Sequence, residues 1–361
     1  MKFGLNMNRK VKLAVVTFAG MRLGYGTGHL IESLSLANEW RPAERPEIKF
    51  FINDFSYAVQ QVRSRGFSFE VYTKSSYADR PFKKIPRLIT DWGYDVILVN
   101  VPVLFKEEIK WLASTISPMV VILDDDQNQF FQVSALINYN INQDPAFYAS
   151  QKTPCYVGIN YVPLNRKKLE QAKSSNSGKF RRGDIVITFG GTDPNQLALR
   201  VLQALFVLNP QSHISLVLGG GSPQSIYKEI SSWLKGHPML CNTYYDLPQE
   251  EFYQLLAVSS FAISAPGNTL YELCFLGIPT AAIAENEATL RVAEKFAQNR
   301  WCTNLGLGIN LPVNDLVPSL GKFLHNNRRP KAPPLDGRGI DRIIDIVKGV
   351  IESKKESIKI S

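Results

Sequence analysis

Cysteine and histidine are scarce in this sequence, and long apolar runs are missing. The 361 residues include four histidines and four cysteines, and the cysteines lie far apart at Cys155, Cys241, Cys274 and Cys302. Without the spacing of zinc ligands, they are expected to be buried free thiols, and no metal site is expected. No apolar run reaches the ~18 to 20 residues that a membrane-spanning helix requires. The amino terminus also lacks the features of a secretory signal, so we expect a soluble, cytoplasmic protein.

Concentrated positive charge is also missing, although the net charge is +9. The basic residues are dispersed, and their densest groups lie at 80–84, 166–168, 179–182 and 327–331. Aromatic residues do not interleave with them as they do in RNA-binding modules, so no nucleic-acid partner is expected. Two interpretations of the surplus charge stay open. It is either an ordinary solvated surface or a source of attraction to phosphate-bearing substrates and to an anionic membrane face.

Short apolar runs alternate with helical patterns along the whole chain, which is typical of parallel sheets with crossover helices. A length of 361 residues and a hydrophobic content of 45% favour two domains with substantial cores. The predicted fold class is therefore α/β, with two Rossmann-like domains that face each other across a cleft. Strands are expected near residues 12–18, 48–53, 67–72, 95–101, 119–124, 135–138, 155–161, 184–189, 214–218, 239–244, 261–264, 280–284 and 303–305.

A polar, glycine-containing segment without periodicity lies at 174–183 and reads as a linker. It separates a first domain at 1–173 from a second domain at 184–336. Beyond them, 337–361 carries apolar residues at helical spacing from Ile340 to Ile351. This pattern predicts a carboxyl-terminal helix that packs back onto the domains.

A glycine-rich loop follows the first expected strand. Residues 23–29 read Leu-Gly-Tyr-Gly-Thr-Gly-His, and a helical pattern begins directly after them. Gly26 and Gly28 allow the backbone to approach a ligand closely at the carboxyl end of the strand. His29 stands at the start of the helix, and an imidazole that titrates near neutral pH suits a general base. The alternative is that His29 only caps the helix.

A second turn of this kind opens the second half. Gly190, Gly191 and Thr192 follow an expected strand, and their backbone amides can hold a phosphate. Asp193 is more readily explained as a cap or turn residue. Taken alone, a pair of glycines in a turn is weak evidence for a ligand.

A third turn lies within residues 263–289, where a strand, a Pro-Gly turn and a helix follow one another. The first amides of this helix favour an anion, and Glu272, one turn further, is placed to reach a hydroxyl beside it. The alternative is that Ser264 and Asn268 only cap the helix and that Glu272 is a solvated acid of the first turn.

Two other motifs are better explained by structure than by chemistry. Asp124, Asp125 and Asp126 have the spacing of a carboxylate clamp for a divalent cation, but they more simply end a strand and cap a helix that begins at Gln127. The glycines at 219–221 form another strand-to-helix turn, which is compatible with phosphate but common in turns generally.

Taken in order, these motifs resemble the GT-B class of nucleotide-sugar enzymes. The resemblance is strongest to the group that contains the UDP-sugar hydrolase of pseudaminic acid biosynthesis and the spore coat polysaccharide proteins, and weaker to MurG. It covers nearly the whole chain. The matching motifs are Gly-x-Gly-x-Gly-His at 24–29, Asp-Asp at 124–125, Tyr-Val-Pro-Leu at 161–164, Gly-Gly-Thr-Asp-Pro-Asn at 190–195, Ser-Ala-Pro-Gly-Asn-Thr-x-x-Glu at 264–272 and Asp-Gly-Arg-Gly-Ile-Asp-Arg at 336–342.

The resemblance implies where substrates bind. The nucleotide is expected against the second domain with Glu272 at the ribose, while the first domain faces the acceptor and supplies His29 as the base. It also implies a UDP-sugar as substrate, with no metal and no other cofactor. The residues implied at the nucleotide sugar are Gly26, Gly28, Gly190, Gly191, Thr192, Ser264, Gly267, Asn268, Thr269, Glu272, Asn286 and Glu287.

The sequence departs from the hydrolase relatives at three places. One is the glycine loop before His29, which is commonly one or two residues shorter in those relatives. Glu32 stands three residues after the histidine, where those relatives usually carry arginine, and Asn286-Glu287 replaces an asparagine-glutamine pair. Loss of a cation near a diphosphate weakens binding unless another basic side chain, such as Arg22 or Arg291, takes its place.

The leading hypothesis is an inverting, metal-independent glycosyltransferase that uses a nucleotide sugar, in the first place a UDP-sugar, to build a surface polysaccharide or glycoconjugate. Its acceptor sugar would be lipid-linked or part of a protein glycan, and a lipid-linked acceptor implies peripheral association with the inner membrane face. A UDP-sugar hydrolase, in which water attacks the anomeric carbon, is the first alternative. A non-catalytic subunit that binds sugar nucleotides is the second.

The expected nucleotide site can be tested by a thermal-shift screen of nucleotides. A ligand that binds only the folded protein raises its melting temperature. We expect UDP to stabilise the wild-type chain more than other nucleotides do, and Glu272→Ala to lose this shift. No response to any nucleotide would favour the non-catalytic alternative.

Overall fold

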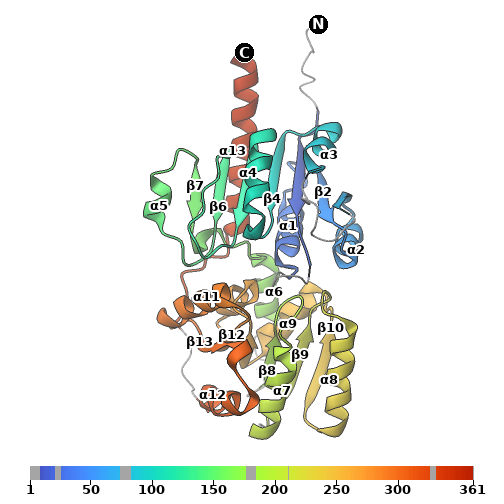
Figure 1. The fold of residues 1–361 in the computed structure, drawn as a ribbon, viewed down its shortest axis with the longest axis vertical. Helices are drawn as coiled ribbons and strands as arrows, with labels where there is room; N and C mark the ends of the chain where they lie inside the picture. Colours follow the sequence, from blue (N-terminus) through green and yellow to red (C-terminus); the bar gives the residue numbers. More distant parts are fainter. Residues whose placement is uncertain are drawn as a thin grey trace.

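The structure is a computed structural model, which describes residues 9–20, 26–73, 83–175, 184–209, 211–325 and 331–360. The strands form two sheets, one of seven strands in the order β3-β2-β1-β4-β5-β6-β7 and one of six in the order β10-β9-β8-β11-β12-β13. The strand pairs are parallel, as the alternating pattern predicts. Figure 1 shows the two α/β halves stacked end to end, with the carboxyl-terminal helix alongside the first.

The first half is an open sheet with helices on both faces. Alternate residues of β1 divide between these faces, so that Leu13 and Val15 pack with α1 and α13 while Ala14 and Val16 pack with α3 and α4. Its strands are β1 Lys12–Thr17, β2 Glu47–Asn53, β3 Ser68–Thr73, β4 Val96–Asn100, β5 Met119–Leu123, β6 Ala135–Asn138 and β7 Cys155–Val157. Its helices are α1 Gly28–Glu39, α2 Ser56–Ser64, α3 Ile85–Trp92, α4 Lys106–Thr115 and α5 Pro145–Ala149, with 3-10 helices η2 Val103–Phe105 and η3 Ile159–Tyr161.

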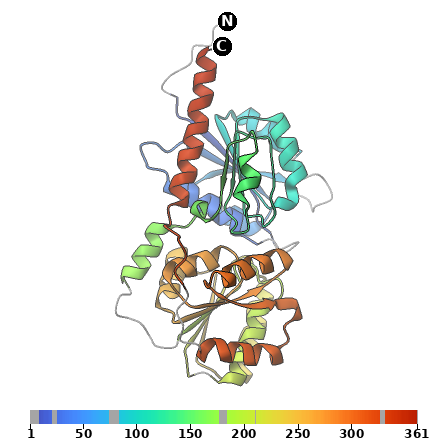
Figure 2. The same cartoon turned by 90° about the vertical axis from the view of Figure 1, so that its left-hand side faces the viewer.

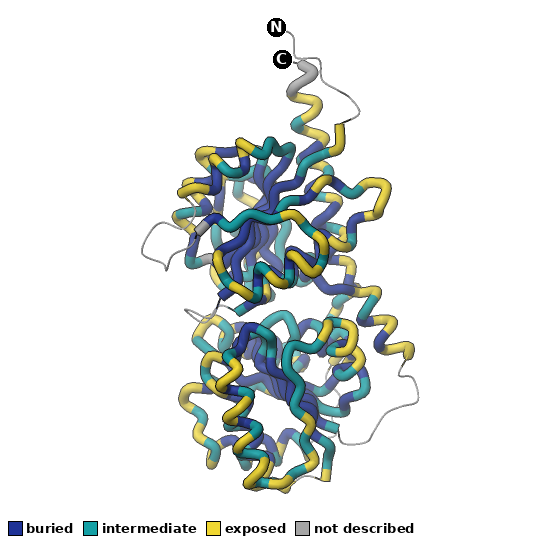
Figure 3. Tube along the Cα trace, turned by 90° about the vertical axis from the view of Figure 1, so that its right-hand side faces the viewer, coloured by how far each residue is buried: buried dark blue, intermediate teal, exposed yellow. Residues whose placement is uncertain are grey.

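The second half repeats this layering. Its apolar strands are covered by α7, α8 and α12 on one face and by α9, α10 and α11 on the other. Its strands are β8 Ile185–Thr188, β9 Ile214–Leu218, β10 Cys241–Tyr245, β11 Phe261–Ser264, β12 Thr280–Ala284 and β13 Thr303–Leu307. Its helices are α7 Leu197–Leu208, α8 Gln224–Gly236, α9 Gln249–Val258, α10 Asn268–Leu276, α11 Glu287–Gln298 and α12 Val313–His325, with 3-10 helix η4 Gly308–Asn310. Figure 3 shows the buried strands inside each half and the exposed residues on the outer helices.

Two helices cross between the halves. Helix α6, Arg166–Ser175, follows the first sheet in sequence but packs against α9 and α10 of the second half. Helix α13, Gly339–Ile360, follows the second half but returns to pack on α1, β4 and β6, as Figure 2 shows. The prediction that the carboxyl-terminal helix packs back is therefore confirmed.

The domain boundaries drawn from the sequence stay predictions. Residues 174 and 175 of the expected linker close α6, and 176–183 lie outside the described residues. Across the described ranges, no helix combines the length and the apolarity that crossing a membrane demands.

Each expected strand is present, but one expected helix is not. The segment after Asp126 was predicted to begin a helix at Gln127, and residues 124–134 instead follow an irregular path. The reason is tertiary: the backbone N–H of Gln129 donates to the Tyr148 hydroxyl over 3.0 Å, and the Phe131 side chain is buried in the first core. These two anchors hold the chain in a conformation that a helix does not provide.

The return of α13 depends on a glycine at its first position. A Cβ built at Gly339 would lie 2.0 Å from the Val162 carbonyl oxygen, whereas one built at Gly349 in the same helix meets nothing within 4 Å. We expect Gly339→Ala to lower the melting temperature, since overpacking costs about 1–3 kcal/mol.

Gly349→Ala is the matched control. It should raise the melting temperature, because alanine in a helix interior is favoured over glycine by about 1 kcal/mol. Equal melting temperatures for the two variants, measured by circular dichroism, would contradict the close contact at Gly339.

Candidate active site between the two sheets

The carboxyl ends of the two sheets face each other, and their loops touch. A Cβ built at Gly191, after β8, would lie 2.1 Å from Thr27 Oγ1, just before α1. A Cβ at Gly26 would lie 3.6 Å from Thr192 Oγ1, which is ordinary contact. The structure thus brings the first two predicted loops together, and the absence of a side chain at Gly191 permits their closest approach. The part of the first loop at 23–25 lies outside the described residues.

His29 is the second residue of α1 and half-buried. Its Nδ1 lies 2.9 Å from Oδ1 of Asn100, the last residue of β4. The residue at the helix-capping position is Thr27, so the interpretation of His29 as a cap does not hold. Instead, Nδ1 of the ring is hydrogen-bonded to the buried side-chain amide of Asn100 at the carboxyl end of β4.

Glu32 lies one turn further along α1 and links the two halves. It is 5% exposed, and its Oε1 accepts hydrogen bonds from the Tyr139 hydroxyl at 2.8 Å and from Nδ2 of Asn268 in the second half. Its Oε2 accepts from Asn100 Nδ2 at 3.0 Å. A Cβ at Gly28 would lie 3.7 Å from Asn268 Nδ2 and 3.8 Å from Glu32 Oε1, which places Gly28 beside this bridge.

Burial and negative charge shift the pKa values around Glu32. Burial, followed by the charge of Glu32, raises the pKa of the Tyr139 hydroxyl well above its usual value. The same two causes raise the pKa of Asp124 to about 7, and Asn140 Nδ2 donates to its Oδ1 over 2.8 Å. Both groups are therefore held toward their protonated forms beside Glu32.

The third predicted loop lies at the amino end of α10. Gly267 occupies the capping position and Asn268 and Thr269 are the first two residues of the helix, so the backbone amides of the first turn point toward the first half. Ser264 is fully buried at the end of β11, where its Oγ donates to the Ala265 carbonyl oxygen over 3.1 Å.

Glu272 lies one turn into α10 and is not a solvated acid. Its Oε1 accepts a hydrogen bond from the Tyr253 hydroxyl at 2.7 Å, and burial raises its pKa to about 7. The carboxyl group already has a protein partner on α9. A ribose hydroxyl would have to share this carboxyl with Tyr253.

Other predicted residues have structural roles in the fold. Asp193 accepts from the amides of Leu197 and Ala198 at 2.8 and 3.0 Å, which confirms it as a cap of α7. Gly190 adopts φ +68, a conformation that favours glycine. Asn286 caps α11 by accepting from the Thr289 amide over 3.0 Å, and Glu287 is exposed at the start of that helix.

The acidic run after β5 meets the second half through an ion pair. Arg291 of α11 pairs with Asp126, whose side chain is 5% exposed. Arg22 and Arg291 were considered as replacements for the arginine that the hydrolase relatives carry at position 32. Arg291 is paired with Asp126, and Arg22 lies outside the described residues. Within the part of the chain that the structure describes, no group of three or more His, Cys, Asp or Glu side chains is arranged to hold a metal ion.

Sequence reasoning missed Asn100 and Tyr139. Asn100 is the one polar residue of the strand run Val-Ile-Leu-Val-Asn and is fully buried at its carboxyl end. A lone amide in that position signals a buried hydrogen-bond network, since an unpaired polar group is costly to bury. Tyr139 carries no comparable signal, because a tyrosine after an apolar strand reads as core.

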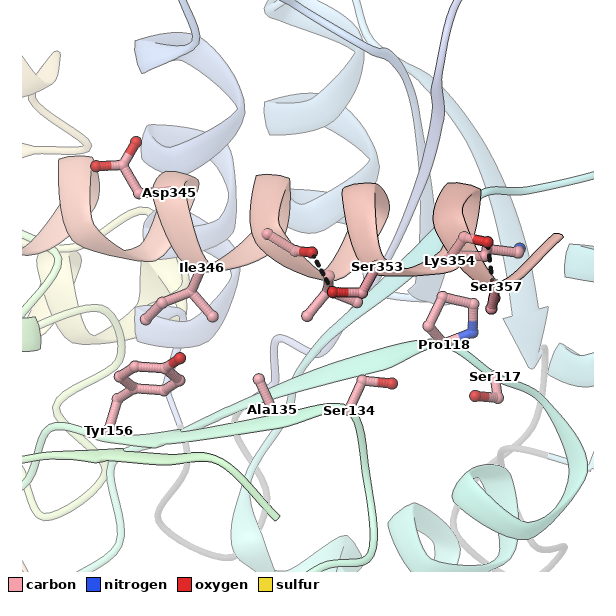
Figure 4. A pocket seen from close by; sticks show the side chains of 12 residues that line it. Ser117, Pro118, Ser134, Ala135, Tyr156, Asp345, Ile346, Ser353, Lys354 and Ser357 are labelled. Carbon is pink, nitrogen blue, oxygen red and sulfur yellow. Dashed lines mark hydrogen bonds between the residues drawn. The ribbon is translucent and has the colours of Figure 1, made fainter. Parts of the chain in front are cut away.

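A large pocket lies away from these loops. It has a volume of about 880 Å³ and lies between α13 and the first sheet, where Ser117 and Ser134 precede β5 and β6 at the amino ends of the strands. Figure 4 shows Tyr156, Ile346 and Lys354 around it. Ligands of parallel sheets bind at the carboxyl ends, so the facing loops and not this pocket are the candidate active site.

Solved structures share this architecture. The UDP-GlcNAc 2-epimerase of Methanocaldococcus jannaschii, in complex with UDP-GlcNAc and UDP, is 12% identical with a TM-score of 0.66, and the match covers 94% of this chain and 100% of that one. MurG of Acinetobacter baumannii is 11% identical with a TM-score of 0.60, over 94% and 99% of the two chains. The chain has the GT-B fold, and the predicted fold class is confirmed.

Two curated proteins are similar in sequence, while no protein-family model matches. The spore coat polysaccharide biosynthesis protein SpsG of Bacillus subtilis is 24% identical over 344 residues, which cover 91% of this chain and 96% of that protein. An uncharacterised protein of Methanocaldococcus jannaschii is 25% identical over 326 residues, which cover 87% of this chain but 65% of that longer protein. The resemblance to the spore coat polysaccharide group is thereby confirmed.

The contact between Thr27 and Gly191 can be tested by the shape of the unliganded protein. Gly191→Ala should push the two halves apart, because its Cβ meets Thr27. We expect a larger radius of gyration in small-angle X-ray scattering, and reversal when Thr27→Ala is added.

Gly26→Ala is the control, since the nearest atom to its Cβ is an ordinary van der Waals contact. An unchanged radius of gyration in Gly191→Ala would show that this contact does not set the distance between the halves.

Proposed function

We propose that this protein is an inverting glycosyltransferase that transfers a sugar from a nucleotide sugar, in the first place a UDP-sugar, to an acceptor hydroxyl without a metal ion. The observation that carries the proposal is the bridge from His29 through Asn100 and Glu32 to Asn268. This bridge supports the proposal because it connects His29, the proposed base of one half, to the first residue of a helix from the other half.

The second half suits the leaving group. The amino end of α10 presents the backbone amides of its first turn and the positive end of the helix dipole, which stabilise an anion. The glycine turn at 190–191 also faces the first half, where Gly191 meets Thr27, and adds backbone amides. Together they would stabilise negative charge as the diphosphate departs, which is the role a metal ion fills in other transferases.

The first half suits the incoming group. His29 is half-buried at the opposite wall, so its ring can accept the proton of a hydroxyl that attacks from the face opposite the diphosphate. Attack from that face inverts the anomeric centre.

The similarity to SpsG, a polysaccharide biosynthesis protein, supports transfer to a sugar acceptor. The acceptor would reach His29 from the side of the first half. A lipid-linked acceptor also fits the net charge of +9, since a basic protein is drawn to an anionic membrane surface.

His29→Ala should lower kcat by about 10²- to 10⁴-fold, the usual contribution of a general base. The assay supplies UDP-GlcNAc, UDP-glucose or UDP-galactose with a panel of glycoside acceptors and follows UDP release. His325→Ala is the matched control, because His325 is exposed at the end of α12, and its activity should equal that of wild type.

The same assay without acceptor separates transfer from hydrolysis. We expect UDP release to depend on the acceptor. Rapid release of UDP and free sugar without acceptor would instead establish a hydrolase, and a loss of less than a few-fold in His29→Ala would remove the base from the mechanism.

A further inference from the structure

The orientation of the Asn100 amide follows from its surroundings. Its Nδ2 faces three oxygen atoms: the His29 carbonyl at 3.2 Å, Glu32 Oε2 at 3.0 Å and Ser33 Oγ at 3.2 Å. Ser33 Oγ donates its own hydrogen to the His29 carbonyl over 2.7 Å, so it can only accept from Asn100. The reverse orientation would place Oδ1 against two acceptors, the His29 carbonyl oxygen and Glu32 Oε2, in a fully buried site, which is strongly unfavourable.

This orientation determines which nitrogen of His29 carries hydrogen. Oδ1 of Asn100 is an acceptor, and it lies 2.9 Å from Nδ1 of His29. Nδ1 must therefore donate, and in the neutral ring Nε2 is left with a free lone pair. An imidazole in water prefers the Nε2–H tautomer, so the protein has to stabilise the Nδ1–H tautomer.

We propose that Asn100 is a positioning residue, held by Glu32, which keeps neutral His29 in the Nδ1–H tautomer and makes Nε2 the atom that accepts the proton. Only the proton transfer rests on the glycosyl transfer proposed above; the tautomer rests on the hydrogen bonds alone. In that transfer, the acceptor O–H bond breaks and its proton goes to Nε2. The acceptor oxygen bonds to the anomeric carbon, and the diphosphate oxygen leaves with the electron pair of the broken bond.

Glu32 makes this arrangement depend on both halves. Its carboxylate holds the Asn100 amide with one oxygen and receives Tyr139 and Asn268 on the other. Asn268 is the first residue of α10, at the expected diphosphate site. The orientation of the base is thus tied to the approach of the helix that binds the leaving group.

The test is a long-range ¹H–¹⁵N correlation spectrum of the full chain, labelled at histidine and recorded at pH 8.5. The chain has four histidines, and His29→Gln identifies the signals of His29. We expect the wild type to show the Nδ1–H pattern at His29. Asn100→Leu should lose it in favour of the Nε2–H form. Asn100→Asp should retain it, because a buried carboxyl group beside Glu32 stays protonated and so keeps a donor toward Glu32 and an acceptor oxygen toward Nδ1.

The other three histidines are internal controls in each spectrum, and their unchanged signals show that a variant is folded. In the transferase assay, Asn100→Leu should lower kcat by about 10²-fold with KM for the UDP-sugar within about twofold, and Asn100→Asp should restore part of kcat. A purely structural role would instead alter the signals of all histidines.

An Nε2–H pattern at His29 in the wild type, or an unchanged pattern in Asn100→Leu, would overturn the proposal even if His29→Ala is inactive. The expected tautomer in a protein that turns over no UDP-sugar would uphold the inference about Asn100 and contradict the proposed function. The wild-type spectrum alone decides the tautomer if Asn100→Leu does not fold.

Discussion

A buried carboxylate joins the two halves of this protein, and the candidate site depends on it. Burying a charge is costly unless hydrogen bonds replace the lost water. Glu32 receives three, from Asn100, Tyr139 and Asn268, of which the last comes from the other half. Because only the meeting of the halves completes this set of donors, the second turn of α1 and the first turn of α10 stabilise each other's positions.

The packing around this bridge brings the halves close together. Gly191 approaches Thr27 without a Cβ between them, and Arg291 pairs with Asp126 at another point of the gap. Helix α6 packs on the second half and helix α13 packs on the first half. These two connections keep the carboxyl ends of both sheets opposed. In the proposed mechanism, a sugar bound there would lie between the amino end of α10 and His29 on α1, which is the geometry that in-line displacement requires.

The fold could be predicted because its signals are local. Central strands such as β4 and β5 read as short runs of valine, isoleucine and leucine. A strand was found at each predicted place, although the one predicted at 155–161 ends at Val157 and is followed by η3. The helix expected at Gln127 was wrong because distant groups, Tyr148 and the core around Phe131, decide the path of that segment.

The site could be predicted only in outline. The glycine loops mark the edge where ligands bind, and the structure brings Gly26, Gly28, Gly191 and Asn268 together there. The roles of Asn100 and Glu32 could not be read in advance, because their hydrogen bonds join residues 68 and 236 positions apart. In the sequence, Glu32 appears only as an acid where a cation was expected.

The central claim is that a nucleotide sugar binds between the two halves, and a crystal structure of the chain soaked with UDP tests it most directly. The account predicts the diphosphate at the amino end of α10, beside the glycine turn at 190–191, with the ribose near Glu272. UDP bound in the pocket under α13, or density for UDP nowhere between the facing loops at saturating concentration, would contradict it.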